Sequence, residues 1–454
     1  MKKLLLWICG GIILAVSALA IYRFGFVKTT PQDGDLNEKV AVILQQNDCF
    51  VCHSFEPETP FYSSFPVIGK MMQSHMRHAV RFCELEEASA SLDKADEILL
   101  AKLEHSMLAD DMPIFEYKMI HWGMGFNKEE KAIIAEWVNA RRNQLHPGCP
   151  YAGQLFSPIP DALPVDPAKV AMGERMYNDT RISLDNTISC ASCHILSDGG
   201  ADEDDARTSE GIYGQHGGVN APTVYNAVFN VQQFWNGRAK DLQEQAAGPP
   251  VNPVEMGDQT WEQIVERLRK DKQLVREFQA LYPGEGLTQA TVTDAIAEYE
   301  KTLLTPGSRF DQYLKGDENA LDAREKAGFK AFTDRGCAAC HAGVILGGKS
   351  FEYMGVFGDY FAERDDDIVR NADDDGLLGF TGNPRDLEKF KVPGLRNVAL
   401  TAPYFHDGSE DDLDDAVEKM FEYELGKDAS DKEVKDITAF LRTLTGKHPS
   451  LIKQ

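Results

Sequence analysis

Three short motifs pair two cysteines with a histidine, and these residues are the best suited to chemistry in the chain. Each motif places two residues between the cysteines and a histidine directly after the second one. The thiols can form thioether bonds to the vinyl groups of haem, and the adjacent imidazole can bind the iron as an axial ligand. A zinc half-site or a dithiol redox pair has no need of that histidine. The motifs therefore predict three covalently bound haems c, held by Cys49, Cys52 and His53, by Cys190, Cys193 and His194, and by Cys337, Cys340 and His341.

A haem that only transfers electrons is usually six-coordinate, and a methionine ligand raises its reduction potential. Four methionines lie before the expected closing helix of the first haem domain: Met107, Met112, Met119 and Met124. We expect Met112 to be the ligand because it precedes Pro113, with Met124 and then Met119 as alternatives. Weaker candidates are the histidines of the same domain: His75, His78, His105 and His121. For the third haem, Met420 is the expected ligand and Met354 its competitor.

Helical patterns flank the haem motifs. Val40, Ile43 and Leu44 fall on one helical face just before the first motif. Residues 127–130 read as a capping box, and an apolar stripe follows them. Strand signals are sparse. The expected fold is mostly α, with three c-type cytochrome-like haem domains after an N-terminal transmembrane helix or signal segment.

The chain divides into five expected segments. Residues 1–28 form the anchor or signal segment, and 29–146 a mono-haem domain. Six prolines mark 147–167 as a linker. Residues 168–315 and 316–454 form two further haem domains, which repeat each other weakly and argue for a duplicated cytochrome unit. They share a proline, an asparagine and a glycine at identical spacings, which are Pro222, Asn226 and Gly237 in one and Pro393, Asn397 and Gly408 in the other.

The chain is strongly acidic, with 47 Lys and Arg against 72 Asp and Glu and a net charge of −25. Such a surface repels nucleic acid and favours a basic protein partner or a neutral small electron donor. We interpret the acidic runs at 202–205, 365–367 and 373–375 as solvated loops. Three cysteines remain outside the haem motifs, namely Cys9, Cys83 and Cys149. The last two either form a disulfide or stay as isolated thiols.

The N-terminus carries an export signal. After a positively charged start, residues 4–22 contain no charge, and as a helix they would span roughly 28 Å, about the thickness of a bilayer core. We favour a retained inner-membrane anchor with the bulk of the protein in the periplasm. The alternative is a cleaved signal peptide, with 18–20 as the cleavage site, and a soluble periplasmic protein. Attachment of haem c outside the cytoplasm agrees with either outcome.

Residues 165–450 resemble the bacterial di-haem cytochrome c peroxidases. The matching segments are 220–223, 234–238, 244–246, 252–256 and 393–408. The extra N-terminal haem domain and the apolar segment make the chain similar to the tri-haem, membrane-attached branch. The resemblance implies reduction of hydrogen peroxide to water, with electrons from quinol or from a small cytochrome or cupredoxin. It also implies a possible homodimer.

The resemblance assigns roles around the middle haem. The haem of His194 would be the peroxidatic one, with His216 as its distal ligand in the resting enzyme. Glu255 resembles the catalytic carboxylate of the family, and Gln245 resembles the amide beside it. Trp235 would relay electrons between the two core haems.

Two further sites follow from the same resemblance. His341 and Met420 would ligate the electron-transferring haem. Asn220 and the backbone carbonyls of Thr401 and Pro403 match a calcium site that couples the two core domains. Oxygen ligands contributed by both domains suit calcium.

General acid–base chemistry also supports peroxide cleavage as the reaction, independently of the family resemblance. Peroxide cleavage needs an open iron position and a group that moves a proton from one peroxide oxygen to the other. A carboxylate can do this as base and then acid, and a neutral amide can orient the peroxide. A plain electron carrier with three six-coordinate haems would leave Gln245 and Glu255 without a purpose. A related di-haem class oxidises residues of a partner protein and places tyrosine on the electron-transferring haem, so Met420 argues against it.

Overall fold

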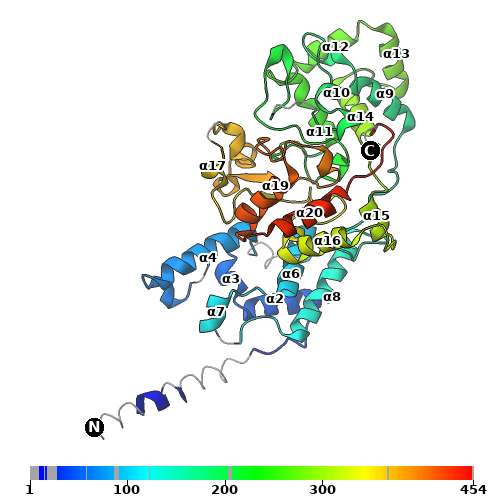
Figure 1. Ribbon diagram of the computed structural model, residues 1–454. Coiled ribbons are helices and arrows are strands. Elements are labelled where there is room, and N and C mark those ends of the chain that lie inside the picture. The colour runs from blue at the N-terminus through cyan, green and yellow to red at the C-terminus, as the bar shows by residue number, and fades with distance from the viewer. Residues whose placement is uncertain are drawn as a thin grey trace. The chain divides into compact units, whose positions relative to one another are not determined.

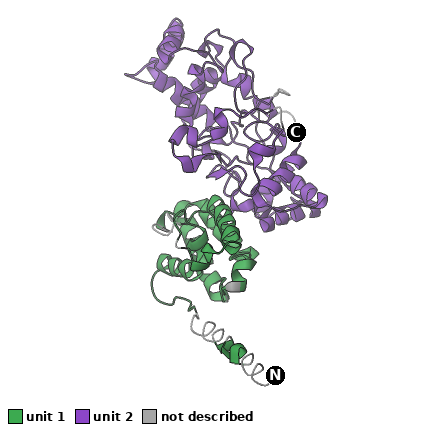
Figure 2. Ribbon diagram, turned by 90° about the vertical axis from the view of Figure 1, so that its left-hand side faces the viewer, with its two compact units in different colours: residues 1–153 green, residues 154–454 purple. Residues whose placement is uncertain are grey.

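The computed structural model describes residues 10–14, 16–17, 28–57, 59–85, 92–121, 123–202, 207–365 and 368–451 (Figure 1). The chain divides into two compact units, residues 1–153 and 154–454, which Figure 2 draws in green and purple. The described elements are almost all helices, which confirms the expected mostly α fold.

The secondary-structure elements described in unit 1 are all helices. Its elements are α2 (Leu36–Gln46), α3 (Cys49–Cys52), η1 (Phe61–Ser64), α4 (Ile68–Phe82), η2 (Leu92–Lys94), α6 (Glu97–Ala109), α7 (Phe115–Ile120) and α8 (Lys128–Leu145). The predicted capping box at the start of α8 is confirmed, because Asn127 and Glu130 bond reciprocally. The predicted face of α2 is buried in a core that it shares with α6 and α8.

The first half of unit 2 surrounds the middle haem motif. Its elements are α9 (Pro167–Tyr177), η3 (Thr180–Ile182), α10 (Cys190–Cys193), η4 (Leu196–Asp198), η5 (Ile212–Gly214), η6 (Ala227–Phe229), α11 (Leu242–Ala247), η7 (Pro249–Val251), α12 (Trp261–Leu268), α13 (Lys272–Leu281) and α14 (Gln289–Glu300). Long loops separate the short elements between α10 and α12. These loops carry most of the predicted site residues.

The second half of unit 2 surrounds the third haem motif. Its helices are α15 (Arg309–Leu314), α16 (Ala323–Arg335), η8 (Cys337–Ala339), α17 (Tyr360–Glu363), η9 (Ala372–Asp375), α18 (Leu378–Thr381), η10 (Pro384–Asp386), η11 (Val398–Leu400), α19 (Leu413–Lys419), the π-helix η12 (Met420–Leu425) and α20 (Asp431–Arg442). Strands β1 (Phe351–Tyr353) and β2 (Lys389–Lys391) form the only described sheet, an antiparallel pair in which Phe351 lies opposite Lys391.

A pair of closely packed helices organises each half of unit 2. Helix α9 packs on α14, and α16 packs on α20 (Figure 1). A glycine lies at each crossing: a Cβ on Gly173 would lie 1.9 Å from the Ala295 carbonyl oxygen, and one on Gly328 would lie 1.8 Å from that of Asp436. Any side chain there would force the helices apart. The two halves thus repeat one packing arrangement, as the sequence repeat indicates.

The predicted linker is partly packed into unit 2. Phe156 and Ile159 are buried, and Arg396 donates a hydrogen bond to the Ser157 carbonyl at 3.1 Å. The segment from residue 154 onward is therefore held against the third haem domain along part of its length.

The apolar N-terminal segment falls mainly outside the described residues, of which only 10–14 and 16–17 belong to it. Within the described residues, no helix combines the length and the hydropathy needed to cross a membrane. The predicted anchor stays a prediction.

Candidate haem and peroxide site

Each haem motif begins on a single helical turn. Cys49 opens α3, Cys190 opens α10 and Cys337 opens η8, and the histidine of each motif follows the turn. Burial raises the pKa of each of these three thiols to about 12. The sulfur atoms of these cysteines therefore lie in an apolar setting, which fits the edge of a bound haem.

Two of the motif histidines are oriented for metal binding. The Nδ1 of His53 donates to the Cys83 carbonyl at 2.7 Å, and the Nδ1 of His341 donates to the Leu346 carbonyl at 3.1 Å. A proton on Nδ1 leaves the lone pair of Nε2 free for iron, and such a backbone bond also fixes the ring orientation. Burial lowers the pKa of His341 to about 4, which keeps its ring neutral.

His194 is held less rigidly. Its Nδ1 is buried and makes no well-formed hydrogen bond to the described residues, although the carbonyls of Gly200 and Pro222 lie close enough to favour the charged ring. Burial is the stronger effect and lowers the pKa of His194. Its backbone carbonyl accepts a 3.0 Å hydrogen bond from the Tyr177 hydroxyl. In all three motifs burial therefore lowers the pKa of the histidine, which favours the neutral imidazole that an axial haem ligand needs.

The methionine candidates differ in exposure. Met112 and Met124 are half-buried, whereas Met119 on α7 is 55% exposed, which disfavours it as a ligand. Met420 is half-buried and begins the π-helix η12, and π segments occur frequently at functional sites. Met354 is also half-buried, directly after β1. The assignments of Met112 and Met420 stay predictions.

Glu255 lies in a half-buried carboxylate site built from neighbouring loops. Asn252 donates to its Oε1 at 2.7 Å, and the Glu255 backbone carbonyl accepts from Ile212 at 2.9 Å. Burial raises the pKa of Glu255, and Asp373 adds to that effect, while Arg238 and the Asn252 bond oppose it. A carboxyl with a raised pKa is suited to both accept and donate a proton near neutral pH.

The other predicted partners of this carboxylate lie less close. Gln245 is half-buried on α11, and it makes no hydrogen bond to Glu255 within the described structure. His216 is exposed, and its Nδ1 donates to the Thr208 carbonyl at 3.0 Å. Their catalytic and distal-ligand roles stay predictions. Arg238 stacks on Phe234, with its guanidinium 3.5 Å from the ring centre.

Trp235 sits where the two halves of unit 2 meet. Its Nε1 donates to the Asn220 carbonyl at 2.8 Å, and its own carbonyl accepts from the Lys391 amide at 2.8 Å. Its ring contacts His406 edge to face, with the centres 6.5 Å apart. The Trp235 indole thus donates to one half of unit 2 and contacts His406 of the other half, an arrangement that suits the predicted relay role.

The predicted calcium site also spans the halves. The Asn220 amide nitrogen contacts the Pro403 carbonyl oxygen at 2.5 Å, and the Asn220 backbone donates to the His406 carbonyl at 2.8 Å. A rotated amide would direct its oxygen to the same place. Thr401 lies two residues before Pro403 on this loop. The described residues include no cluster of three His, Cys, Asp or Glu side chains able to hold a metal, so calcium here would depend on amide and carbonyl oxygens and stays a prediction.

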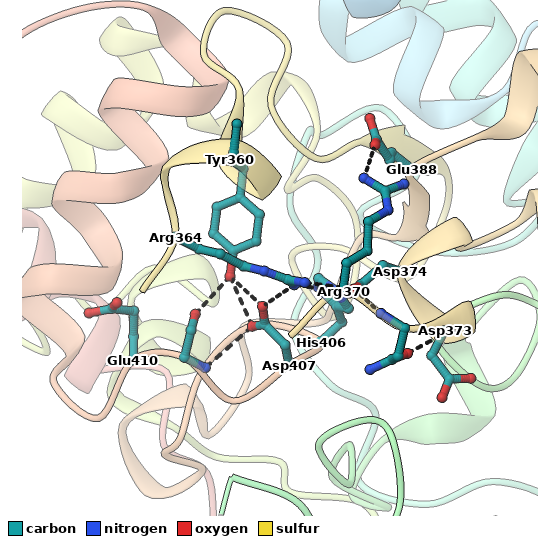
Figure 3. A network of polar contacts seen from close by, with 12 residues as sticks. Tyr360, Arg364, Arg370, Asp373, Asp374, Glu388, His406, Asp407 and Glu410 are labelled. Carbon is teal, nitrogen blue, oxygen red and sulfur yellow. Dashed lines mark hydrogen bonds and ion pairs between the residues drawn. The ribbon is translucent and has the colours of Figure 1, made fainter. Parts of the chain in front are cut away.

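A buried polar network braces this junction (Figure 3). His406 Nε2 lies 2.9 Å from Asp374, Arg364 binds both Asp374 and Asp407, and the Tyr360 hydroxyl donates to Asp407 at 2.9 Å. Although burial opposes it, bonds from His406 and Arg364 hold the pKa of Asp374 well below its usual range. The interpretation of 373–375 as a solvated loop is therefore wrong for Asp374, which is 1% exposed.

Comparison with known proteins decides the family. The family described as di-haem cytochrome c peroxidase matches residues 167–319, and a haem-binding domain family matches residues 26–140. Cytochrome c peroxidase Ccp of Escherichia coli is 44% identical over 418 residues, which cover 90% of this chain and 88% of that protein. The chain belongs to the di-haem cytochrome c peroxidase family. It is a haem-dependent peroxidase.

Other members of the family cover the two core haem domains. Cytochrome c551 peroxidase of Pseudomonas aeruginosa is 43% identical over 307 residues, or 66% of this chain and 86% of that protein. The crystal structure of a MauG-like protein associated with microbial copper homeostasis superposes with a TM-score of 0.56 and 27% identity, covering 67% of this chain and 98% of that one.

Sequence reasoning did not assign a role in this peroxidase to Asn252, Asp373 or Asp374. The first was detectable, because an asparagine before Pro253 is a common turn former that can reach a residue three positions on. The two aspartates carried no such signal, since only the tertiary fold brings Asp374 to His406 and Asp373 near Glu255. Cys83 and Cys149 form no disulfide within the described structure.

Proposed function

We propose that this peroxidase carries three haems c and reduces hydrogen peroxide to water at the haem of His194. The observation that carries the proposal is the Glu255 carboxylate. It has a raised pKa, a fixed hydrogen bond from Asn252, and a backbone bond to Ile212 on the loop that leads to His216. A site with those properties has no purpose in a simple electron carrier.

The protein's own groups would manage the protons. Haem bound at His194 supplies an iron that accepts peroxide and delivers electrons to it. Glu255 takes the proton from one peroxide oxygen and returns it to the other, so that two electrons and two further protons yield two waters. Asn252 holds the carboxylate in place, and Arg238 adds positive charge beside it. Gln245 is proposed to orient the peroxide.

Electrons are proposed to pass from the donor to the His53 haem, then to the His341 haem, and through Trp235 to the His194 haem. The indole hydrogen bond to Asn220 and the bond between the Lys391 amide and the Trp235 backbone carbonyl support the last step, because they hold Trp235 between two separate loops. Met112 and Met420 would complete the two electron-transferring haems, and His216 would occupy the resting peroxidatic iron.

Features of unit 1 favour quinol over a small cytochrome or cupredoxin as the donor. Beside the first haem motif, Tyr117 donates to Asp48 at 2.9 Å and stacks on His121, which lies 2.5 Å from the Tyr62 hydroxyl. Exposed apolar side chains lie close in sequence to Tyr62 and Tyr117, namely Phe61, Phe65, Val67, Phe115 and Met119. Quinol oxidation releases protons and involves an apolar donor, so proton acceptors within an apolar surface suit it.

The remaining proposals concern location and assembly. An uncharged segment at 4–22 supports a single inner-membrane anchor with the haem domains in the periplasm. One calcium ion at Asn220, Thr401 and Pro403 is proposed to couple the halves of unit 2. A homodimer is proposed from the resemblance to the di-haem peroxidases.

The test is stopped-flow absorbance of the fully reduced, haem-loaded protein mixed with a slight excess of hydrogen peroxide. We expect rapid reoxidation, with peroxide consumed in proportion to the electrons lost. Repeating the reduction with a soluble quinol and with a reduced small cytochrome identifies the donor. Slow, partial reoxidation in both the wild type and His216→Gly, in which no distal histidine can block the iron, would favour an electron carrier.

A further inference from the structure

Lys391 is a buried lysine without a counter-charge. It ends β2 and is only 4% exposed. Its ammonium makes no hydrogen bond or ion pair with the residues that the structure describes, and burial is the one influence on its pKa, which falls to about 8. Burying a charged group without a partner is strongly unfavourable, so a lysine in this position needs an explanation.

The arginines that are buried in the described part of the chain show the contrast. Each has a carboxylate at close range: Arg142 with Glu97 at 2.7 Å, Arg364 with Asp374 at 2.7 Å, and Arg396 with Asp311 at 2.8 Å. These three buried guanidinium groups are each paired with a carboxylate, whereas the ammonium of Lys391 is not. At Lys391 the missing anion is best sought in a group bound to the protein.

The surroundings of Lys391 indicate which bound group would supply the missing negative charge. Its amide donates to the Trp235 carbonyl at 2.8 Å, and the carbonyl of Pro393, two residues on, lies beside the ring of His341. The preceding residue, Phe390, stacks on His406 at 4.1 Å. Successive side chains of a strand point to opposite faces, so Lys391 is directed away from His406.

We propose that Lys391 is the counter-ion of a propionate of the haem attached at Cys337 and Cys340. A haem carries two propionate carboxylates, and an ammonium bound to one of them forms a strong charge-assisted hydrogen bond. Because the backbone of Lys391 is bonded to Trp235, the same residue would position the propionate edge of this haem against the relay. The positive charge would also favour the reduced iron and raise the reduction potential.

The experiment is a spectroelectrochemical titration of the full-length, haem-loaded protein without peroxide. Lys391→Met is compared with Lys391→Arg and with the matched control Lys389→Met on the same strand. The haem of His341 is identified by Met420→His, which changes its spectrum. We expect Lys391→Met to lower its reduced-to-oxidised ratio about tenfold at fixed potential, or about 59 mV for one electron. The arginine variant and the control should titrate like the wild type.

If the Lys391→Met protein does not load haem, the proposal is tested instead by infrared spectroscopy of the Lys391→Arg variant. In Lys391→Arg the infrared carboxylate band of isotope-labelled propionates should shift, because guanidinium binds carboxylate in a bidentate manner. An unmoved band, an unchanged potential in Lys391→Met, or a shift confined to the His194 haem would overturn the proposal. No peroxide is used, so these outcomes do not depend on the proposed peroxidase mechanism. The role of Lys391 rests on the proposed function only in requiring that a haem is attached at Cys337 and Cys340.

Discussion

Asn226 and Asn397 donate hydrogen bonds to the same hydroxyl, that of Thr305, at 2.8 and 3.0 Å. Both asparagines have a left-handed backbone and each precedes a short helix, η6 or η11. They are the repeated asparagines of the two core haem domains. Thr305, which is fully buried, therefore lies at the point where the duplicated halves are joined.

Replacing Thr305 with valine should destabilise unit 2. The change leaves two buried amides without an acceptor, and each costs about 1–3 kcal/mol. We expect the free energy of unfolding to fall by about 2–6 kcal/mol, measured by denaturant titration of the haem-loaded protein with circular dichroism. Thr305→Ser keeps the hydroxyl and should lose only about 1 kcal/mol for the missing methyl group. Equal losses in the two variants would mean that the shared hydroxyl has little importance.

Glu255→Gln should retain all three haems and lose roughly 10²–10⁴ in turnover, the usual size of general acid–base help. The glutamine still accepts the bond from Asn252, so the loop keeps its shape. Steady-state peroxidase rates and haem content are measured together. Glu266→Gln, on the exposed face of α12, is the control and should turn over normally. Near-normal turnover in Glu255→Gln would remove this residue from the mechanism.

Arg238→Gln should move the acid limb of the pH–rate profile to higher pH. Glu255 acts as a base only when ionised, so kcat/KM falls as pH drops through its pKa. Burial already raises that pKa, and the positive charge of Arg238 holds it down. Removing the charge therefore raises the pKa further. The profile of kcat/KM against pH is measured for wild type, Arg238→Gln and Arg238→Lys, and only the glutamine variant should shift. If the acid limb of the pH–rate profile does not move in Arg238→Gln, the electrostatic role of Arg238 is contradicted.

Glu300→Gln should stabilise the protein at neutral and alkaline pH. Burial raises the pKa of Glu300 to about 8, and its Oε2 has no hydrogen-bond partner among the described residues. A raised folded-state pKa means that the folded protein binds more protons than the unfolded chain. The associated stability is complete below the usual glutamate pKa and is lost as pH rises towards 8. At pH 7 the loss is on the order of 3 kcal/mol. Unfolding at pH 5 and pH 8 should therefore differ less in the glutamine variant than in the wild type.

Local features were predictable because their causes are local. The haem motifs depend on a spacing of four residues and the capping box of α8 on three, and both need only a single helical turn to bring the groups together. The buried face of α2 follows from helical periodicity. The family resemblance likewise came from short contiguous segments. Those signals established the haem chemistry, the helical fold and the duplicated core.

The tertiary structure decided which distant groups meet. Asp374 lies in an acidic run that looks solvated, yet Arg364 and His406 approach from other segments and bury it. Lys391 looks like an ordinary strand lysine until the strand is placed against Trp235. In each case burial and charge pairing depend on contacts made across the fold, and a linear pattern contains no information about them. Sequence alone therefore predicted where haem attaches, while the packing of the two halves of unit 2 decided which buried and charged groups surround those motifs.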